Sequence, residues 1–92
     1  MFDIILSSQF KKDLKLIAKR GYKLNLLEII IDKIANHTKL EEKYRDHALT
    51  GNYIGFRECH IQSDWLLIYR IENDNLILFL SRTGTHSDLF NW

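Results

Sequence analysis

The stretch IGFRECHIQSDWLLIYRIENDNLILFLSR, residues 54–82, decides the fold of this 92-residue chain. It is rich in β-branched, aromatic and leucine residues, and polar residues interrupt it at two places. We therefore expect three strands, at 54–61, 65–71 and 75–82. Strands joined by short connections pair with their neighbours in sequence, so these three should form an antiparallel meander.

The residues before this stretch predict one strand and two helices. A short apolar run at 2–6 suits a first strand. A helical repeat of apolar residues follows, in which one of the serines at 7–8 can cap the start and Gly21 can end the last turn. A second repeat predicts a helix from about Asn25, where Glu28 stands at the position of a capping box.

The predicted element order is β-α-α-β-β-β. The second helix should end near residues 36–37, and residues 38–52 show little periodicity and read as a loop. The short connection between the helices implies an antiparallel pair, packed as one layer on an antiparallel sheet, so the fold class is α+β. The length and the 46% hydrophobic share suit a single domain over residues 1–92.

Composition excludes several classes of protein. The longest apolar runs are five residues, whereas a membrane span needs about 20, so we expect no membrane association. The sequence starts without the basic segment of a signal peptide. The one cysteine, Cys59, cannot form an internal disulfide and has the strand parity of a small core residue. These features favour a cytoplasmic protein.

The lengths of the two connections predict which side chains meet on the sheet. A four-residue loop at 72–75 places Trp65 opposite Arg82. A two-residue loop at 62–63 places His60 opposite Trp65. Directly opposed residues share a face, so these three side chains should form one row across the meander.

This row has the chemistry for cutting RNA without a metal or cofactor. Asp64 lies at its end, and His86 can fold back towards Arg82. Attack by the ribose 2′-hydroxyl needs a base and an acid, which histidine can supply, and a cation for the phosphate, which arginine supplies. Aromatic side chains such as Trp65 can stack on unpaired bases. Phe90 is placed for the same role.

Two other features have more than one interpretation. Four side chains provide nitrogen and oxygen atoms that zinc accepts, but their spacing matches no compact metal motif: His47, His60, Asp64 and His86. Residues 1–40 carry eight basic and four acidic side chains. The basic ones on the first helix either follow a phosphate backbone or form a solvated face: Lys11, Lys12, Lys15, Lys19, Arg20 and Lys23.

Four segments resemble a known family: DHALTG (46–51), FRECHI (56–61), DWLLIY (64–69) and RTGTHSDLF (82–90). They are similar to YafQ-type toxins of the RelE/ParE superfamily, from bacterial type II toxin–antitoxin systems. The resemblance implies the RelE-like fold of microbial ribonucleases. It also implies a ribosome-dependent endoribonuclease that cuts mRNA in the A site and so arrests translation.

The resemblance further implies partners and site residues. The toxin would be neutralised by a cognate antitoxin, typically of DinJ-like ribbon–helix–helix type, and would meet operator DNA only through that complex. The family's active-site positions fall on His47, His60, Asp64, Trp65, Arg82, His86 and Phe90. His60, Asp64 and His86 would handle protons. Arg82 would stabilise the phosphate, and Phe90 would help to hold the substrate.

The chain departs from the family pattern at three places. Ala48 and Ser63 stand where prolines are common, and Trp92 extends past the usual ending. Within the superfamily, the alternative is a non-catalytic ParE-like toxin that binds DNA gyrase. Such a toxin would not need the two histidines and the aspartate together.

Overall fold

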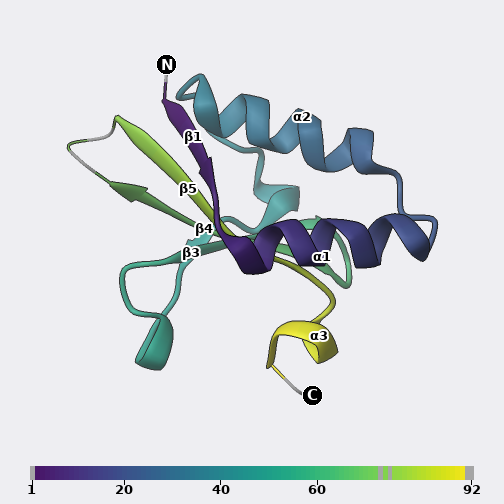
Figure 1. The fold of residues 1–92 in the computed structure, drawn as a ribbon. Coiled ribbons are helices and arrows are strands. Elements are labelled where there is room, and N and C mark those ends of the chain that lie inside the picture. Colours follow the sequence, from purple (N-terminus) through teal and green to yellow (C-terminus); the bar gives the residue numbers. More distant parts are fainter. Residues whose placement is uncertain (1, 73, 75, 91–92) are drawn as a thin grey trace.

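The computed structural model describes residues 2–72, 74 and 76–90. The elements, with η for a 3₁₀ helix, are β1 (Asp3–Leu6), α1 (Ser8–Lys19), α2 (Leu24–Ala35), η1 (Glu42–Tyr44), β2 (His47–Ala48), η2 (Gly51–Tyr53), β3 (Arg57–Gln62), β4 (Trp65–Glu72), β5 (Ile77–Gly84) and α3 (His86–Phe90). Figure 1 shows α1 and α2 as an antiparallel pair, with α3 apart from them near the C-terminus. The predicted α+β class is confirmed. No helix within these ranges is long and apolar enough to cross a membrane.

The sheet has five strands in the order β1-β5-β4-β3-β2, and it is mixed. The predicted meander of β3, β4 and β5 is antiparallel, but β1 runs parallel to β5, so the expectation of a wholly antiparallel sheet is wrong. A parallel pair needs a long connection, and here the chain between β1 and β5 contains both long helices and the other three strands. The predicted loop at 38–52 also contains a short strand, β2, which pairs with β3.

The two long helices begin in different ways. The Oγ of Ser7 accepts a hydrogen bond from the backbone N–H of Phe10 at 2.9 Å, as expected for an N-cap. The cap residue of α2 is Lys23, and no side chain bonds there, so the expected capping box from Asn25 to Glu28 is wrong. Packing of the apolar face of α2 on the sheet provides its stability instead.

The sheet buries a core on each of its two faces. The larger core joins α1 and α2 to the odd-numbered residues of β4, and the fully buried Cys59 belongs to it, as predicted. Burial raises the pKa of the Cys59 thiol, which keeps it protonated. The smaller core lies on the opposite face, where Leu89 of α3 covers Leu66 and Ile68.

The strand register differs from the prediction at both connections. The β3–β4 turn lies at residues 63–64, and a bulge interrupts β3 between His60 and Gln62, so His60 faces Leu66 and not Trp65. In the β4–β5 pair, Arg82 faces Ile68, with an irregularity between Ile68 and Tyr69. A one-residue slip moves a side chain to the other face of a sheet. The predicted row of three side chains is therefore wrong.

Trp65 lies in the larger core and not at the site. Its ring is 1% exposed and packs edge-on against Tyr22, with 5.1 Å between ring centroids. Its Nε1–H donates to the Oγ1 of Thr83 at 2.9 Å, and that hydroxyl donates to the carbonyl of Leu66 at 2.7 Å. Trp65 in this position cannot stack on an RNA base, so its predicted role is wrong.

Candidate active site

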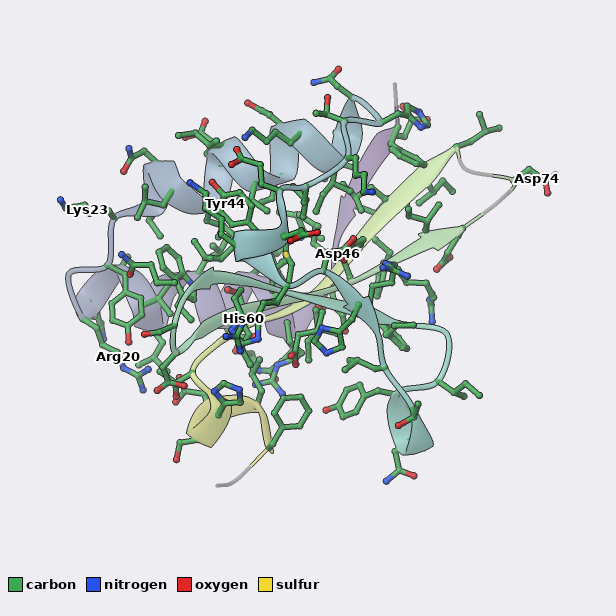
Figure 2. All side chains as sticks on the ribbon, turned by 180° about the vertical axis from the view of Figure 1, so that it is seen from behind. Arg20, Lys23, Tyr44, Asp46, His60 and Asp74 are labelled. Carbon is green, nitrogen blue, oxygen red and sulfur yellow. The ribbon has the colours of Figure 1, made fainter. Side chains whose placement is uncertain are left out.

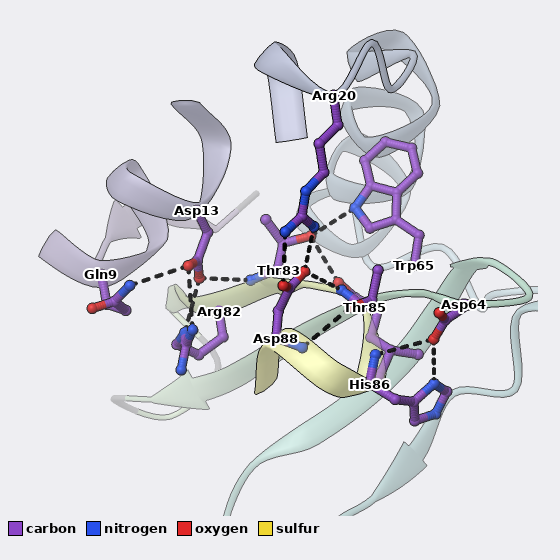
Figure 3. A network of polar contacts seen from close by, with 11 residues as sticks. Gln9, Asp13, Arg20, Asp64, Trp65, Arg82, Thr83, Thr85, His86 and Asp88 are labelled. Carbon is purple, nitrogen blue, oxygen red and sulfur yellow. Dashed lines mark hydrogen bonds and ion pairs between the residues drawn. The ribbon is translucent and has the colours of Figure 1, made fainter. Parts of the chain in front are cut away.

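Two histidines from distant parts of the chain meet on the sheet face that α3 covers. His60 projects from β3 and His86 begins α3, and their rings lie edge-to-face with 5.8 Å between centroids. Asp64, in the β3–β4 turn, accepts two hydrogen bonds from His86, one from Nδ1 at 2.6 Å and one from the backbone N–H at 3.0 Å. Figure 3 shows both contacts. The structure thus brings together three of the predicted site residues.

The contact with Asp64 fixes the protonation pattern of the His86 ring. The backbone N–H of His86, and then its ring, lower the pKa of the Asp64 carboxyl, so this group is ionised near neutral pH. An ionised carboxylate only accepts, so Nδ1 of His86 carries a proton.

A buried carboxylate that sequence reasoning missed, Glu58, lies between two predicted site histidines. Its Oε1 is 3.5 Å from Nε2 of His47 and 3.6 Å from Nε2 of His60. Nδ1 of His47 donates to the carbonyl of Arg45 at 2.6 Å. Glu58 is 5% exposed and shares the strand parity of His60, which is the sequence signal that could have identified it.

Arg82 shares the sheet face of His60 and is held by a second buried carboxylate, Asp13 of α1. The Nε of Arg82 lies 2.8 Å from one carboxylate oxygen and its terminal nitrogen 3.3 Å from the other. Asp13 also accepts from the backbone N–H of Thr83 at 3.1 Å and from the Gln9 amide. β1 pairs with β5 only as far as Leu80, so Asp13 satisfies the open edge beyond that point (Figure 3).

A network of polar contacts holds α3, and therefore His86, in place. Asp88 accepts from the backbone N–H of Thr85 at 2.9 Å, and the Thr85 hydroxyl accepts from the N–H of Asp88. Arg20, at the end of α1, pairs with both oxygens of Asp88 at 2.6 and 2.9 Å. This pairing, first through Arg20, holds the pKa of the Asp88 carboxyl well below its usual range.

A glycine makes this close approach possible. Gly84 has φ of 154°, and a Cβ placed there would lie 3.0 Å from a carboxylate oxygen of Asp88 and 3.1 Å from its Cβ. A side chain at this position would force Asp88 to shift by a few tenths of an ångström and would strain the backbone. The glycine of the segment RTGTHSDLF therefore has a packing role.

The remaining predicted residues lie around this centre. Phe90 is half-buried in the smaller core, with its ring 5.5 Å from that of Tyr53. Three lysines on α1 are exposed, as binding to a phosphate backbone requires: Lys11, Lys12 and Lys15.

Within the described part of the chain, no three side chains of His, Cys, Asp or Glu are arranged to hold a metal ion. Trp92 lies outside the described residues.

Comparisons with known proteins identify the family. A family model described as a bacterial toxin of type II toxin–antitoxin systems, YafQ, matches residues 2–91. The mRNA interferase toxin YafQ of Escherichia coli K12 is 43% identical over 89 residues, which cover 96% of this chain and 95% of that protein.

Solved structures agree with this match. A metal-bound toxin from Helicobacter pylori superposes with a TM-score of 0.91 at 44% identity, covering 98% of this chain and all of that one. A chain in the E. coli DinJ–YafQ complex superposes with a TM-score of 0.87 at 40% identity, covering 98% and 99%. The chain belongs to the YafQ family of toxins from bacterial type II toxin–antitoxin systems.

Proposed function

We propose that this toxin is an mRNA interferase, an endoribonuclease that arrests translation by cutting mRNA on the ribosome. A relative at 43% identity is named an mRNA interferase toxin. The observation that carries the proposal is the convergence of His60, His86 and Asp64, since this set provides two groups able to transfer protons near neutral pH.

In the proposed mechanism the two histidines act on opposite sides of the scissile phosphate. His60 takes the proton of the 2′-hydroxyl, and the 2′ oxygen attacks phosphorus. The bond from phosphorus to the 5′ oxygen breaks, and His86 protonates that oxygen. The products are a 2′,3′-cyclic phosphate and a 5′-hydroxyl. Positioned proton transfer of this kind contributes about 10²–10⁴-fold.

Asp64 acts by orienting His86. Its Oδ1 accepts a hydrogen bond from the ring and one from the backbone of His86, so we assign it to orienting the acid. This leaves His60 as the base. Glu58, which lies beside both His47 and His60, holds these rings on the same face of the sheet.

Arg82 and Phe90 hold the substrate in this proposal. Arg82 stabilises the charge that gathers on the phosphate, and Asp13 fixes the direction of its guanidinium. Phe90 packs against one unpaired base. The exposed lysines at 11, 12 and 15 contact ribosomal phosphates.

We further propose that a DinJ-like ribbon–helix–helix antitoxin neutralises the toxin, and that the toxin meets operator DNA only through this complex. The support is the E. coli complex in which a YafQ chain of 40% identity is bound to DinJ. Co-expression with a DinJ-like antitoxin, followed by co-purification, tests the partnership.

The experiment that tests the activity is His86→Ala, expressed from an inducible promoter. We expect growth to continue and primer extension to find intact transcripts, whereas the unaltered chain produces cut ones. His37→Asn is the matched control, because His37 is exposed and stacks on Phe2 away from the site.

Cut transcripts in cells that express the His86→Ala chain would contradict the proposed acid. Growth arrest by the unaltered chain with intact transcripts and damaged DNA would instead favour a gyrase-directed toxin.

A further inference from the structure

A cleft of about 500 Å³ opens beside His60, and the other residues that line it have no part in the proposed chemistry. It runs between η1 and the β3–β4 turn, and the residues that matter here are Lys43, Tyr44, Arg45, His60, Gln62 and Ser63. Figure 2 labels Tyr44 and His60, which come from these two sides. The volume lies within the roughly 300–1,000 Å³ of small-ligand sites.

The two charged side chains that line this cleft, Lys43 and Arg45, are positive. Four of the five arginines form ion pairs with carboxylates, and among the residues that the structure describes no such partner is found for Arg45. Within the described ranges, Lys43 has no carboxylate within ion-pair distance either. Asp46, which follows Arg45 in the sequence, accepts hydrogen bonds from Tyr69 and Arg57 instead. The cleft therefore favours an anion.

The cleft also offers an aromatic ring. Tyr44 is half-buried against the larger core, and the Lys43 ammonium lies 5.1 Å from its ring centroid. The Lys33 ammonium lies 5.6 Å from the same centroid, so a base that stacks on this ring must displace one of the two lysines. Arg45 has φ of 49° in the left-handed region, and its carbonyl holds the ring of His47. The turn thus joins the cleft to the candidate active site.

We propose that this cleft binds the nucleotide of single-stranded RNA that precedes the scissile phosphate, with its base on Tyr44 and its phosphate between Lys43 and Arg45. We place the nucleotide before the scissile phosphate, and not the one after it, in this cleft because the nucleotide that carries the attacking 2′-hydroxyl must lie next to the proposed base, His60. The inference rests on the proposed function. It adds a subsite that positions substrate and can select the base.

An acidic peptide, such as a segment of a protein partner, would meet the same two cations. It would make no use of the aromatic ring or of the adjoining histidine. The combination of a stacking ring, two cations and a proton-transfer group favours RNA.

Binding tests the subsite without any need for cleavage. The probe is a labelled RNA decamer with a 2′-O-methyl group on every nucleotide, which cannot undergo 2′-hydroxyl attack. We expect Lys43→Gln/Arg45→Gln to weaken binding at least tenfold and to reduce the slope of log K against log salt by about 0.7, since the one phosphate held between these cations contributes about 0.7 on a single strand. Lys39→Gln, the control on an exposed lysine outside the cleft, should bind as the unaltered chain does.

The ring is tested by Tyr44→Leu, with Tyr44→Trp as the rescue variant. Loss of one stacked base should weaken binding about tenfold, and tryptophan should restore it. In an NMR titration of the unaltered chain, the amide shifts of residues 43–45 and 60–63 should move first. Circular dichroism of each variant checks that it is folded.

Several results would overturn the subsite. They are no binding of the decamer by the unaltered chain, equal loss in Lys39→Gln, shifts confined to other surfaces, or binding of a decaglutamate peptide in preference to RNA. Cleavage by the His86→Ala chain would contradict the proposed mechanism and leave this binding result standing. Intact binding in the cleft variants would remove only the subsite.

Discussion

Replacing Asp13 should destabilise the whole protein, although it lies on a helix whose other charged residues face solvent. Asp13 is 5% exposed and accepts hydrogen bonds from Arg82, Thr83 and Gln9. Asp13→Ala leaves the buried N–H of Thr83 without an acceptor, which costs about 1–3 kcal/mol. It also leaves the partly exposed Arg82 unpaired, which costs less than the roughly 3–5 kcal/mol of a fully buried pair.

We therefore expect Asp13→Ala to lower the free energy of unfolding by about 3 kcal/mol, or the melting temperature by about 12–24 °C for a domain of this size. Asp13→Asn keeps a carbonyl oxygen for one donor and should lose only about 1–2 kcal/mol. Asp32→Ala on the exposed side of α2 is the control and should change stability by about 0.5 kcal/mol at most.

Urea denaturation followed by circular dichroism measures these differences at constant pH. A loss below about 1 kcal/mol in Asp13→Ala would refute the reasoning, because it would show that the buried contacts contribute little. Equal losses in the alanine and asparagine variants would show that the charge of Asp13 is irrelevant.

Four further predictions concern the site and its supports. Gly84→Ala should lower the free energy of unfolding, measured in urea, by about 1–3 kcal/mol and should slow mRNA cleavage, because the new Cβ meets Asp88. Unchanged stability would contradict this packing role. Trp65→Phe should lower the free energy of unfolding by about 1–2 kcal/mol and keep its affinity for RNA, since the indole donates a hydrogen bond to Thr83 inside the core. Weaker RNA binding by a stably folded variant would restore the role predicted from sequence. Because the pKa of Asp88 is lowered in the folded protein, its carboxylate contributes fully to stability above the unfolded pKa of about 3.9, and this contribution is lost as the pH falls below that value. Acid titration should therefore destabilise the unaltered chain more than the Asp88→Asn variant. Parallel curves for the two chains would count against the pair with Arg20. Charge reversal at Lys11, Lys12 and Lys15 should weaken ribosome binding and flatten its salt dependence, and an unchanged slope would mark those lysines as a solvated face.

The elements could be predicted from the sequence, but their register could not. Alternation and helical spacing identify the strands and helices because burial on one face imposes these periods. Register depends on the turn, and here the β3–β4 turn lies one residue later than the sequence suggested. Trp65 was the predicted partner of both His60 and Arg82, and the observed partners, Leu66 and Ile68, lie one and three residues further along β4. Both displacements are odd, so the two errors cancel, and His60 and Arg82 do share a face.

The site was predictable where its residues follow a motif and was missed where they belong to the interior. His60, Asp64 and His86 were identified by their chemistry and by resemblance. Asp13 follows Phe10 by three residues and precedes Ile17 by four, so it lies on the buried stripe of α1. A carboxylate at such a position must have partners, but the sequence could not show that Arg82, 69 residues later, is one of them.

The parallel pairing of β1 with β5 affects how the protein is synthesised. Residues 3–6 have no strand partner until residues 77–80 have left the exit tunnel, and Asp13 and Arg20 must wait for Arg82 and Asp88. A partly translated chain therefore lacks Arg82, His86 and one edge of its sheet. The candidate site is thus assembled only when β5 and α3 can fold back on the N-terminal elements.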